Sequence, residues 1–255
     1  MGIEQDKIYL QIISEANSKG KELRSQTQLP NLPTKEDLEP YVGKIYAIDR
    51  SLIDEIRRHL DHHEQQPNNG FDHLIYVATL GTYVAELECN ERGITDSQLK
   101  NEILQRTWRL GLLHDIERYL GYGQIHQIEG LKETRKILSN LNIKDPYLED
   151  QVFLHDNINV QPRNNLAFDI PFFSIFAADH LNYGLEWEKD KWDFYKVKGI
   201  DPLKAVTDIN FLYPLRDGSS IRQTQWGINV VLPYLNFGIG IAEHIKKTFG
   251  AISTK

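Results

Sequence analysis

The feature that most constrains this chain is a repeated pattern, in which the apolar face of an expected helix also carries a histidine or an aspartate. In residues 71–91, helical spacing places five residues on one face: His73, Val77, Leu80, Val84 and Leu87. Three later apolar faces carry His114, His155 and Asp179 in the same way. A buried carboxylate is costly unless it is paired or bound to a cation. We therefore expect these groups to meet a partner or a cation in the interior.

The rest of the chain also follows helical periodicity. Helices are expected at about 3–23, 48–63, 97–117, 129–141, 147–157, 171–184 and 221–249, with a further helix from about residue 202. A proline-containing connector is expected at 27–40, with residues 33–36 as a candidate start of a short helix. The sequence has no alternating apolar pattern typical of β-hairpins and no internal repeat. It predicts an all-α fold in three parts: N-terminal helices with the connector at 1–69, a core at 70–185, and a C-terminal helical extension packed on that core at 186–255.

Composition narrows the classes of partner and compartment. The 255 residues include 29 Lys and Arg against 36 Asp and Glu, which gives a net charge of −7. This balance argues against binding nucleic acid or anionic lipid by bulk charge. The single Cys89 excludes an internal disulfide framework and a cysteine-rich zinc site. No signal-peptide pattern and no run of about 20 apolar residues is present, so we expect a cytoplasmic protein without membrane contact.

The order of the polar residues resembles a known family. Six residues follow the ligand order of the HD-domain superfamily of metal-dependent phosphohydrolases: His73, His114, Asp115, His126, His155 and Asp179. The surrounding segments are similar as well. GFDHLIYVATLGTYVAEL resembles the first helix of that family, LGLLHDIER its LLHDIGK motif, HQIEGLKETRKIL its H-x-x-x-G helix, and IFAADHLNYG its closing aspartate helix. The resemblance covers residues 70–183, a little under half of the chain.

The resemblance implies an HD-domain helical bundle with extra helices at both ends. It implies a first metal site made by His73, His114, Asp115 and Asp179. It implies a second site completed by His126 and His155, with Asp115 bridging the two ions. Imidazole and carboxylate together suit Fe, Mn, Co, Ni or Zn, with Mg as a further candidate, so one or two divalent ions are expected.

The activity that the resemblance implies is hydrolysis of a phosphoester by a metal-activated water, with a small phosphorylated molecule or nucleotide as substrate. Asp115 would hold the metals, and Arg118, which replaces the lysine of the family motif, would act in catalysis and bind the phosphate. Glu117 replaces the motif's glycine and is expected to bring a negative charge near the site. The sequence leaves open whether the chain forms a homo-oligomer.

Other interpretations of the same residues stay open at this point. The same six ligands would serve an HD-fold di-iron oxygenase, and a non-catalytic ligand-binding HD protein would also retain the fold. His126 is expected in a loop, and Asp156 on the outer face of its helix. The cluster of His59, His62 and His63 is expected to be a solvated helix end rather than a metal site.

Overall fold

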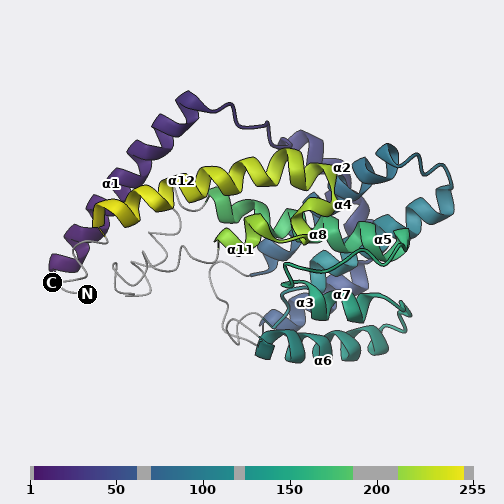
Figure 1. Cartoon of the computed structure of the whole chain (residues 1–255). Helices are drawn as coiled ribbons and strands as arrows, with labels where there is room; N and C mark the ends of the chain where they lie inside the picture. Colours follow the sequence, from purple (N-terminus) through teal and green to yellow (C-terminus); the bar gives the residue numbers. More distant parts are fainter. Residues whose placement is uncertain (1–2, 62–69, 118–123, 186–211, 250–255) are drawn as a thin grey trace. The chain divides into compact units, whose positions relative to one another are not determined.

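The structure, a computed structural model, describes residues 3–61, 70–117, 124–185 and 212–249. Within these ranges the chain is helical and contains no strand, which confirms the predicted all-α fold. The helices are α1 (Ile3–Gln26), α2 (Lys35–Ile48), α3 (Arg50–Asp61), α4 (Phe71–Glu91), α5 (Ser97–Leu113), α6 (Gln124–Asn140), α7 (Leu148–Leu154), α8 (Leu166–Leu185), α11 (Leu212–Asp217) and α12 (Leu232–Phe249) (Figure 1). A 3₁₀ turn (Ser220–Gln223) and a π-helical turn (Gly227–Val231) precede α12.

The chain divides into two compact units. The larger unit comprises residues 32–179 and 223–226, and therefore contains α2 to α7 and most of α8. The smaller unit comprises residues 1–31, 180–222 and 227–255. All six residues of the proposed ligand order fall in the larger unit.

The smaller unit is built on two helices, α1 and α12, which run side by side in opposite directions (Figure 1). Both helices bury apolar side chains, among them Tyr9 and Ile12 of α1 and Ile241 and Ile245 of α12. His244 Nε2 lies 3.1 Å from a carboxylate oxygen of Glu15. These contacts fix the register of the two helices.

The core of the larger unit follows the predicted apolar faces. On α5 every member of the predicted face is buried: Ile103, Thr107, Leu110 and His114. On α4, Val77, Leu80 and Val84 are fully buried, whereas Leu87 is 40% exposed. The faces of α4 and α5 therefore form the interior that periodicity predicts.

Helix boundaries differ from the prediction at several places. Helix α6 begins at Gln124 rather than at residue 129, so His126 lies in a helix and not in a loop. Helix α8 begins at Leu166 and contains Pro171, which was expected to open the helix. Within the connector predicted at 27–40, Thr34 and Asp37 form a capping box that starts α2 at Lys35, which agrees with the short helix considered at 33–36.

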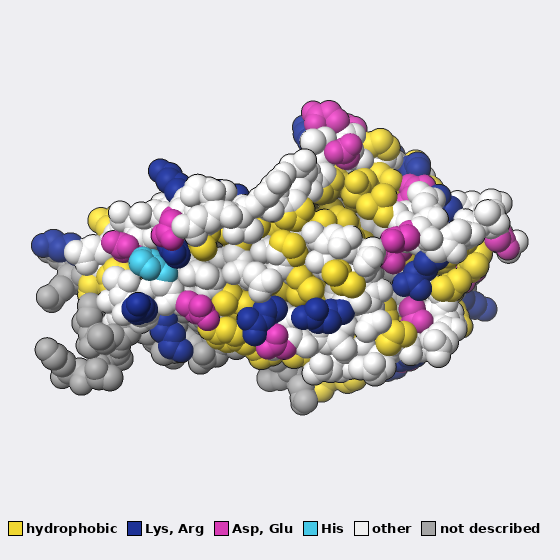
Figure 2. All heavy atoms as spheres, turned by 45° about the horizontal axis from the view of Figure 1, so that its top comes forward, with side chains coloured by type: hydrophobic (Ala, Val, Ile, Leu, Met, Phe, Trp, Pro, Cys, Tyr) yellow, Lys and Arg dark blue, Asp and Glu magenta, His cyan; other side chains and the backbone are white. Residues whose placement is uncertain are grey.

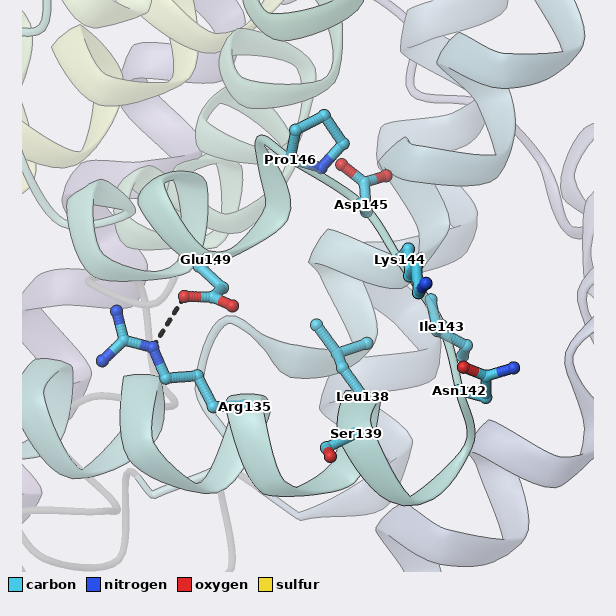
Figure 3. Close-up of a pocket in the computed structure, with 9 residues that line it drawn as sticks. All are labelled: Arg135, Leu138, Ser139, Asn142, Ile143, Lys144, Asp145, Pro146 and Glu149. Carbon is cyan, nitrogen blue, oxygen red and sulfur yellow. Dashed lines mark hydrogen bonds and ion pairs between the residues drawn. The ribbon is translucent and has the colours of Figure 1, made fainter.

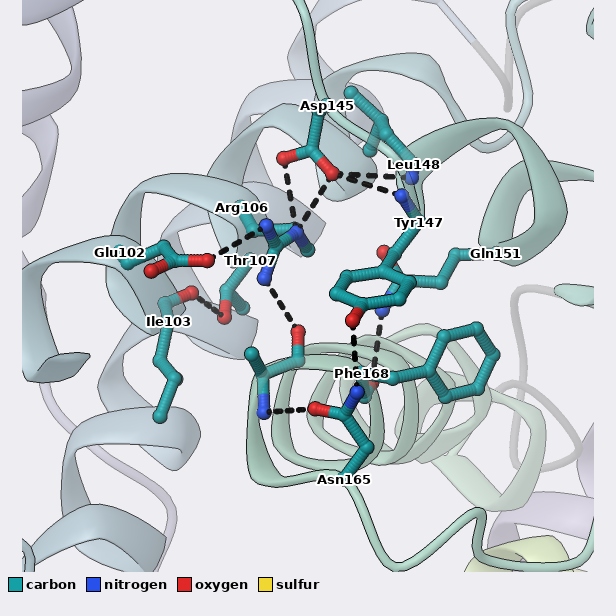
Figure 4. A network of polar contacts seen from close by, with 11 residues as sticks. Glu102, Ile103, Arg106, Thr107, Asp145, Tyr147, Leu148, Gln151, Asn165 and Phe168 are labelled. Atoms are coloured by element: carbon teal, nitrogen blue, oxygen red, sulfur yellow. Dashed lines mark hydrogen bonds and ion pairs between the residues drawn. The ribbon is translucent and has the colours of Figure 1, made fainter.

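Figure 4 shows a network of polar contacts that positions α7. Arg106 of α5 is 3% exposed, and its Nε lies 2.8 Å from both oxygens of Asp145. Asp145 in turn accepts hydrogen bonds from the backbone N–H groups of Tyr147 and Leu148, at the start of α7. Arg106 also donates to the carbonyl of Ala167 in α8, at 2.6 Å. One buried guanidinium therefore fixes α7 and α8 against α5.

The described surface agrees with the balanced composition. On the face drawn in Figure 2, basic and acidic side chains are interspersed, and the described residues of that face show no large patch of one sign. Among the helices of the described ranges, none has both the length and the apolar content needed to cross a bilayer.

A first prediction concerns the close approach of α5 to α4 at Gly111. A Cβ added there would lie 2.8 Å from the backbone nitrogen of Ala78, closer than real side chains come. We expect Gly111→Ala to lower the free energy of unfolding by about 1–3 kcal/mol, measured by urea denaturation. The control is Gly43→Ala in α2, where nothing lies within 4 Å of the added Cβ. Equal stability of the two variants would contradict this packing.

A second prediction concerns the buried Arg106. Arg106→Met leaves the carboxylate of Asp145 buried without its guanidinium, so we expect a loss of about 3–5 kcal/mol in the free energy of unfolding. Arg135→Met is the matched control, because the ion pair of Arg135 with Glu149 is exposed at both ends. It should cost less than about 1 kcal/mol. A control that costs as much as the test variant would refute the role given to Arg106.

Candidate metal centre

Four of the six predicted ligands form a first group in the larger unit. His73 comes from the first turn of α4, His114 and Asp115 directly follow α5, and Asp179 lies in α8. One nitrogen or oxygen atom from each side chain lies within 4.8 Å of the others. The helices α4 and α5 pack closely, and Asp179 of α8 lies beside His73 and His114. Residues as far apart in the sequence as His73 and Asp179, 106 positions, therefore lie within 4.8 Å of one another.

The distances within the first group fit a cation. Oδ1 of Asp179 lies 3.3 Å from His73 Nε2 and 3.5 Å from His114 Nε2. Oδ2 of Asp115 lies 3.7 Å from His114 Nε2. Neighbouring ligand atoms that each sit about 2.1 Å from a metal are separated by about 3.0–3.5 Å. The group is therefore close to the spacing that a bound ion requires.

The orientation of His114 supports this interpretation. Its Nδ1 lies 2.8 Å from the carbonyl oxygen of Gly111. Since a carbonyl only accepts, Nδ1 carries the hydrogen, and in the neutral ring the lone pair of Nε2 faces the carboxylates. That Nε2 atom is buried and forms no hydrogen bond with any residue that the structure describes. A backbone carbonyl that fixes one ring nitrogen while the other points at carboxylates is typical of metal-binding histidines.

Asp115, His126 and His155 form a second group, and all three are buried. His155 Nε2 lies 3.1 Å from Oδ1 of Asp115 and 3.3 Å from Nε2 of His126. Nδ1 of His155 lies 2.6 Å from the carbonyl oxygen of Val152, which fixes the ring as in His114. Two facing imidazole nitrogens repel unless a proton or a cation lies between them.

Asp115 is shared by the two groups. Its Oδ2 faces His73 and His114, and its Oδ1 faces His126 and His155. The side chain is only 5% exposed. A single buried carboxylate thus presents one oxygen to each group, and these His and Asp groups could hold one or two metal ions.

Electrostatics at His155 favour positive charge at this place. Burial lowers the pKa of His155, but the nearby charges of Asp156 and Asp115 and hydrogen bonds to Asp115 and Val152 outweigh burial and raise it to about 9. The same negative field would act on a divalent cation, because both a proton and a metal ion bind the lone pair of Nε2.

Asp156 is a site residue that the sequence interpretation missed. Its Oδ2 lies 3.1 Å from His126 Nε2, and its Oδ1 lies 3.5 Å from His155 Nε2. The prediction that Asp156 lies on the outer face of a helix is wrong, because α7 ends at Leu154 and helical periodicity does not extend to Asp156. The repeated His-Asp dipeptide at 155–156 was the signal that could have identified it.

Glu117, which replaces the glycine of the family motif, belongs to a third group together with His59 and Glu133. Oε1 of Glu117 lies 2.8 Å from His59 Nε2, and Nδ1 of His59 lies 3.3 Å from Oε1 of Glu133. The side chain of His59 is 13% exposed, so the expectation of a solvated helix end is wrong for this residue. Glu117 therefore lies against His59 of α3, and with Glu133 these side chains form a further group that could hold a metal ion. His62, His63 and Arg118 lie outside the described residues.

A surface pocket lies elsewhere in the larger unit, where α6 connects to α7 (Figure 3). It is lined by Arg135, Leu138, Ser139, residues 142–146 and Glu149, and the ion pair of Arg135 with Glu149, 2.6 Å long, closes one side. Its lining includes none of the six predicted ligands, so it is separate from the candidate metal centre.

Comparison with protein families, with curated proteins and with solved structures found no match for this chain. The geometry described here is compatible with an HD domain.

A third prediction follows from the grouping of the ligands. A cation that binds only the folded chain stabilises it, by about 2.7 kcal/mol when its free concentration is 100 times its dissociation constant. We expect Mn²⁺ to raise the melting temperature of the chelator-treated protein, and Asp115→Asn to remove this rise. Asp150→Asn, a change at an exposed carboxylate of α7, is the control and should keep the rise. A melting temperature that Mn²⁺ leaves unchanged in the unmutated chain would contradict metal binding.

Proposed function

We propose that this protein is a metal-dependent phosphohydrolase of the HD type, which cleaves a phosphoester of a small molecule or nucleotide. The observation that carries the proposal is the buried Asp115, which presents one oxygen to each of two His/Asp groups. A carboxylate shared between two sets of imidazoles could hold two ions close enough together for two-metal hydrolysis.

The sequence pattern supports the same proposal. The six ligands occur in the order that HD-domain phosphohydrolases share, and the described part of the chain is all-α. A donor set of imidazoles and carboxylates suits Fe, Mn, Co, Ni or Zn, with Mg also compatible. Divalent ions held there would supply the acidity that activates a water and the charge that binds phosphoryl oxygens.

The residues of the chain have separate tasks in this proposal. Asp115 would hold both ions. The backbone carbonyls of Gly111 and Val152 orient the rings of His114 and His155, which directs Nε2 of each ring toward Asp115. Arg118 follows Asp115 by three residues, and we assign to it the binding of the substrate phosphate through its guanidinium fork.

The test is a phosphatase screen of the purified chain loaded with Mn²⁺, Co²⁺, Ni²⁺ or Mg²⁺, using an aryl phosphate, sugar phosphates, nucleotides and dinucleotides. We expect turnover of at least one phosphoester, with loss of turnover and of bound metal in Asp115→Ala. Asp150→Asn should remain active. Full metal occupancy without turnover of any phosphoester would overturn the proposal.

A parallel measurement distinguishes the di-iron oxygenase that the same ligands would serve. The iron-loaded, reduced chain is incubated with the same compounds while oxygen consumption is recorded. The phosphohydrolase proposal expects release of phosphate or of a phosphomonoester without oxygen uptake. Oxygen uptake that depends on Asp115, without phosphoester cleavage, would replace hydrolysis by oxygenation.

Arg118 has its own test, which uses the conservative lysine. We expect Arg118→Ala to lower kcat/KM by about 10- to 100-fold, as the loss of one charge-assisted phosphate contact implies. Arg118→Lys should recover part of that loss, because lysine keeps the positive charge but not the fork. Equal kcat/KM in the alanine variant and the unmutated chain would remove Arg118 from the site.

A further inference from the structure

The two candidate metal groups are unequal if only the six predicted ligands are counted. The first group has two imidazoles, of His73 and His114, and two carboxylates, of Asp115 and Asp179. The second has two imidazoles, of His126 and His155, but only the carboxylate of Asp115. Asp156 stands beside the second group and lies outside the family pattern that the sequence resembles.

We infer that Asp156 is a further metal ligand and completes the second group. Its Oδ2 lies 3.1 Å from His126 Nε2, the same separation as that between Asp115 Oδ1 and His155 Nε2. Its Oδ1 lies 3.5 Å from His155 Nε2. The two carboxylates therefore face the same pair of nitrogens, and each lies closest to a different one. This inference rests on the proposed function only for the presence of the cations.

The position of Asp156 relative to Asp179 points the same way. An oxygen of Asp156 and an oxygen of Asp179 lie within 4.8 Å of one another. Like charges this close repel, and divalent cations beside them offset the repulsion. Asp156 therefore lies beside the second group and close to Asp179 of the first. With Asp156 included, the two groups contain three carboxylates.

With Asp156 as a ligand of the second group, the two candidate metal groups become chemically alike. Each group then has two imidazoles and two carboxylates, with Asp115 common to both. Two divalent cations bring four positive charges and the three carboxylates bring three negative ones, which leaves one positive charge to attract an anionic phosphate. We expect both groups to prefer the same ion and to bind it with similar affinity. The side chain of Asp156 is 25% exposed, so it lies at the rim of the site.

The experiment counts and titrates Mn²⁺ on the full chain, without any assay of activity. The chelator-treated protein is titrated by calorimetry, and bound Mn²⁺ is counted by elemental analysis after dialysis. The unmutated chain is expected to bind two ions. Asp156→Asn should keep the first and bind the second at least about tenfold more weakly, because the amide removes the charge but keeps the shape. In electron paramagnetic resonance, the unmutated chain should show the spectrum of a spin-coupled Mn²⁺ pair, and Asp156→Asn should show the spectrum of a single Mn²⁺ ion.

Matched variants make the result specific. Asp150→Asn removes an exposed carboxylate from the same helix and should bind two ions as tightly as the unmutated chain. Asp179→Asn should weaken the first group instead. Circular dichroism confirms folding, and Asp156→Ser serves as a second neutral variant if the amide disturbs it.

The outcomes separate this inference from the proposed function. Two ions bound to Asp156→Asn and Asp156→Ser at unchanged affinity would overturn the ligand role of Asp156 and leave the proposed function standing. An unmutated chain that binds no Mn²⁺ would overturn both. A second ion that is weakened in the Asp156 variants but not in Asp150→Asn establishes Asp156 as a ligand.

Discussion

The structure depends on one electrostatic constraint, the burial of Asp115 among four imidazole rings. A carboxylate that is only 5% exposed loses its hydration, and that loss has to be offset by hydrogen bonds or by positive charge close to it. Both of its oxygens face imidazole Nε2 atoms, and two of those rings, of His114 and His155, are held by backbone carbonyls at Nδ1. The side chains around Asp115 are therefore arranged so that cations could bind beside its two oxygens.

The packing of the other residues in the larger unit keeps these side chains in position. The close contact of Gly111 with α4 sets the distance at which the end of α5, with His114 and Asp115, meets His73. Arg106 joins α5 to the start of α7 through Asp145, and His155 directly follows the end of α7 at Leu154. Stability and the geometry of the candidate site are thus connected through α5, because the residues that pack it against its neighbours also fix the separations between the candidate ligands.

Much of this arrangement could be predicted from the sequence, because apolar faces with a 3.6-residue period identify both the helices and their buried side. The faces of α5 and α7 led to the buried His114 and His155. The interpretation failed where periodicity carries no information. Asp156 lies just past a helix end, the start of α6 was placed too late for His126, and the contact of His59 with Glu117 joins residues 58 positions apart. Such contacts depend on the packing of whole helices, which a single sequence does not specify.

Anomalous X-ray scattering from crystals grown with Mn²⁺ shows directly whether cations bind on both sides of Asp115. We expect two anomalous peaks, one beside Oδ2 of Asp115 near His73, His114 and Asp179, the other beside Oδ1 near His126 and His155. Crystals saturated with Mn²⁺ that show no peak next to Asp115 would contradict it.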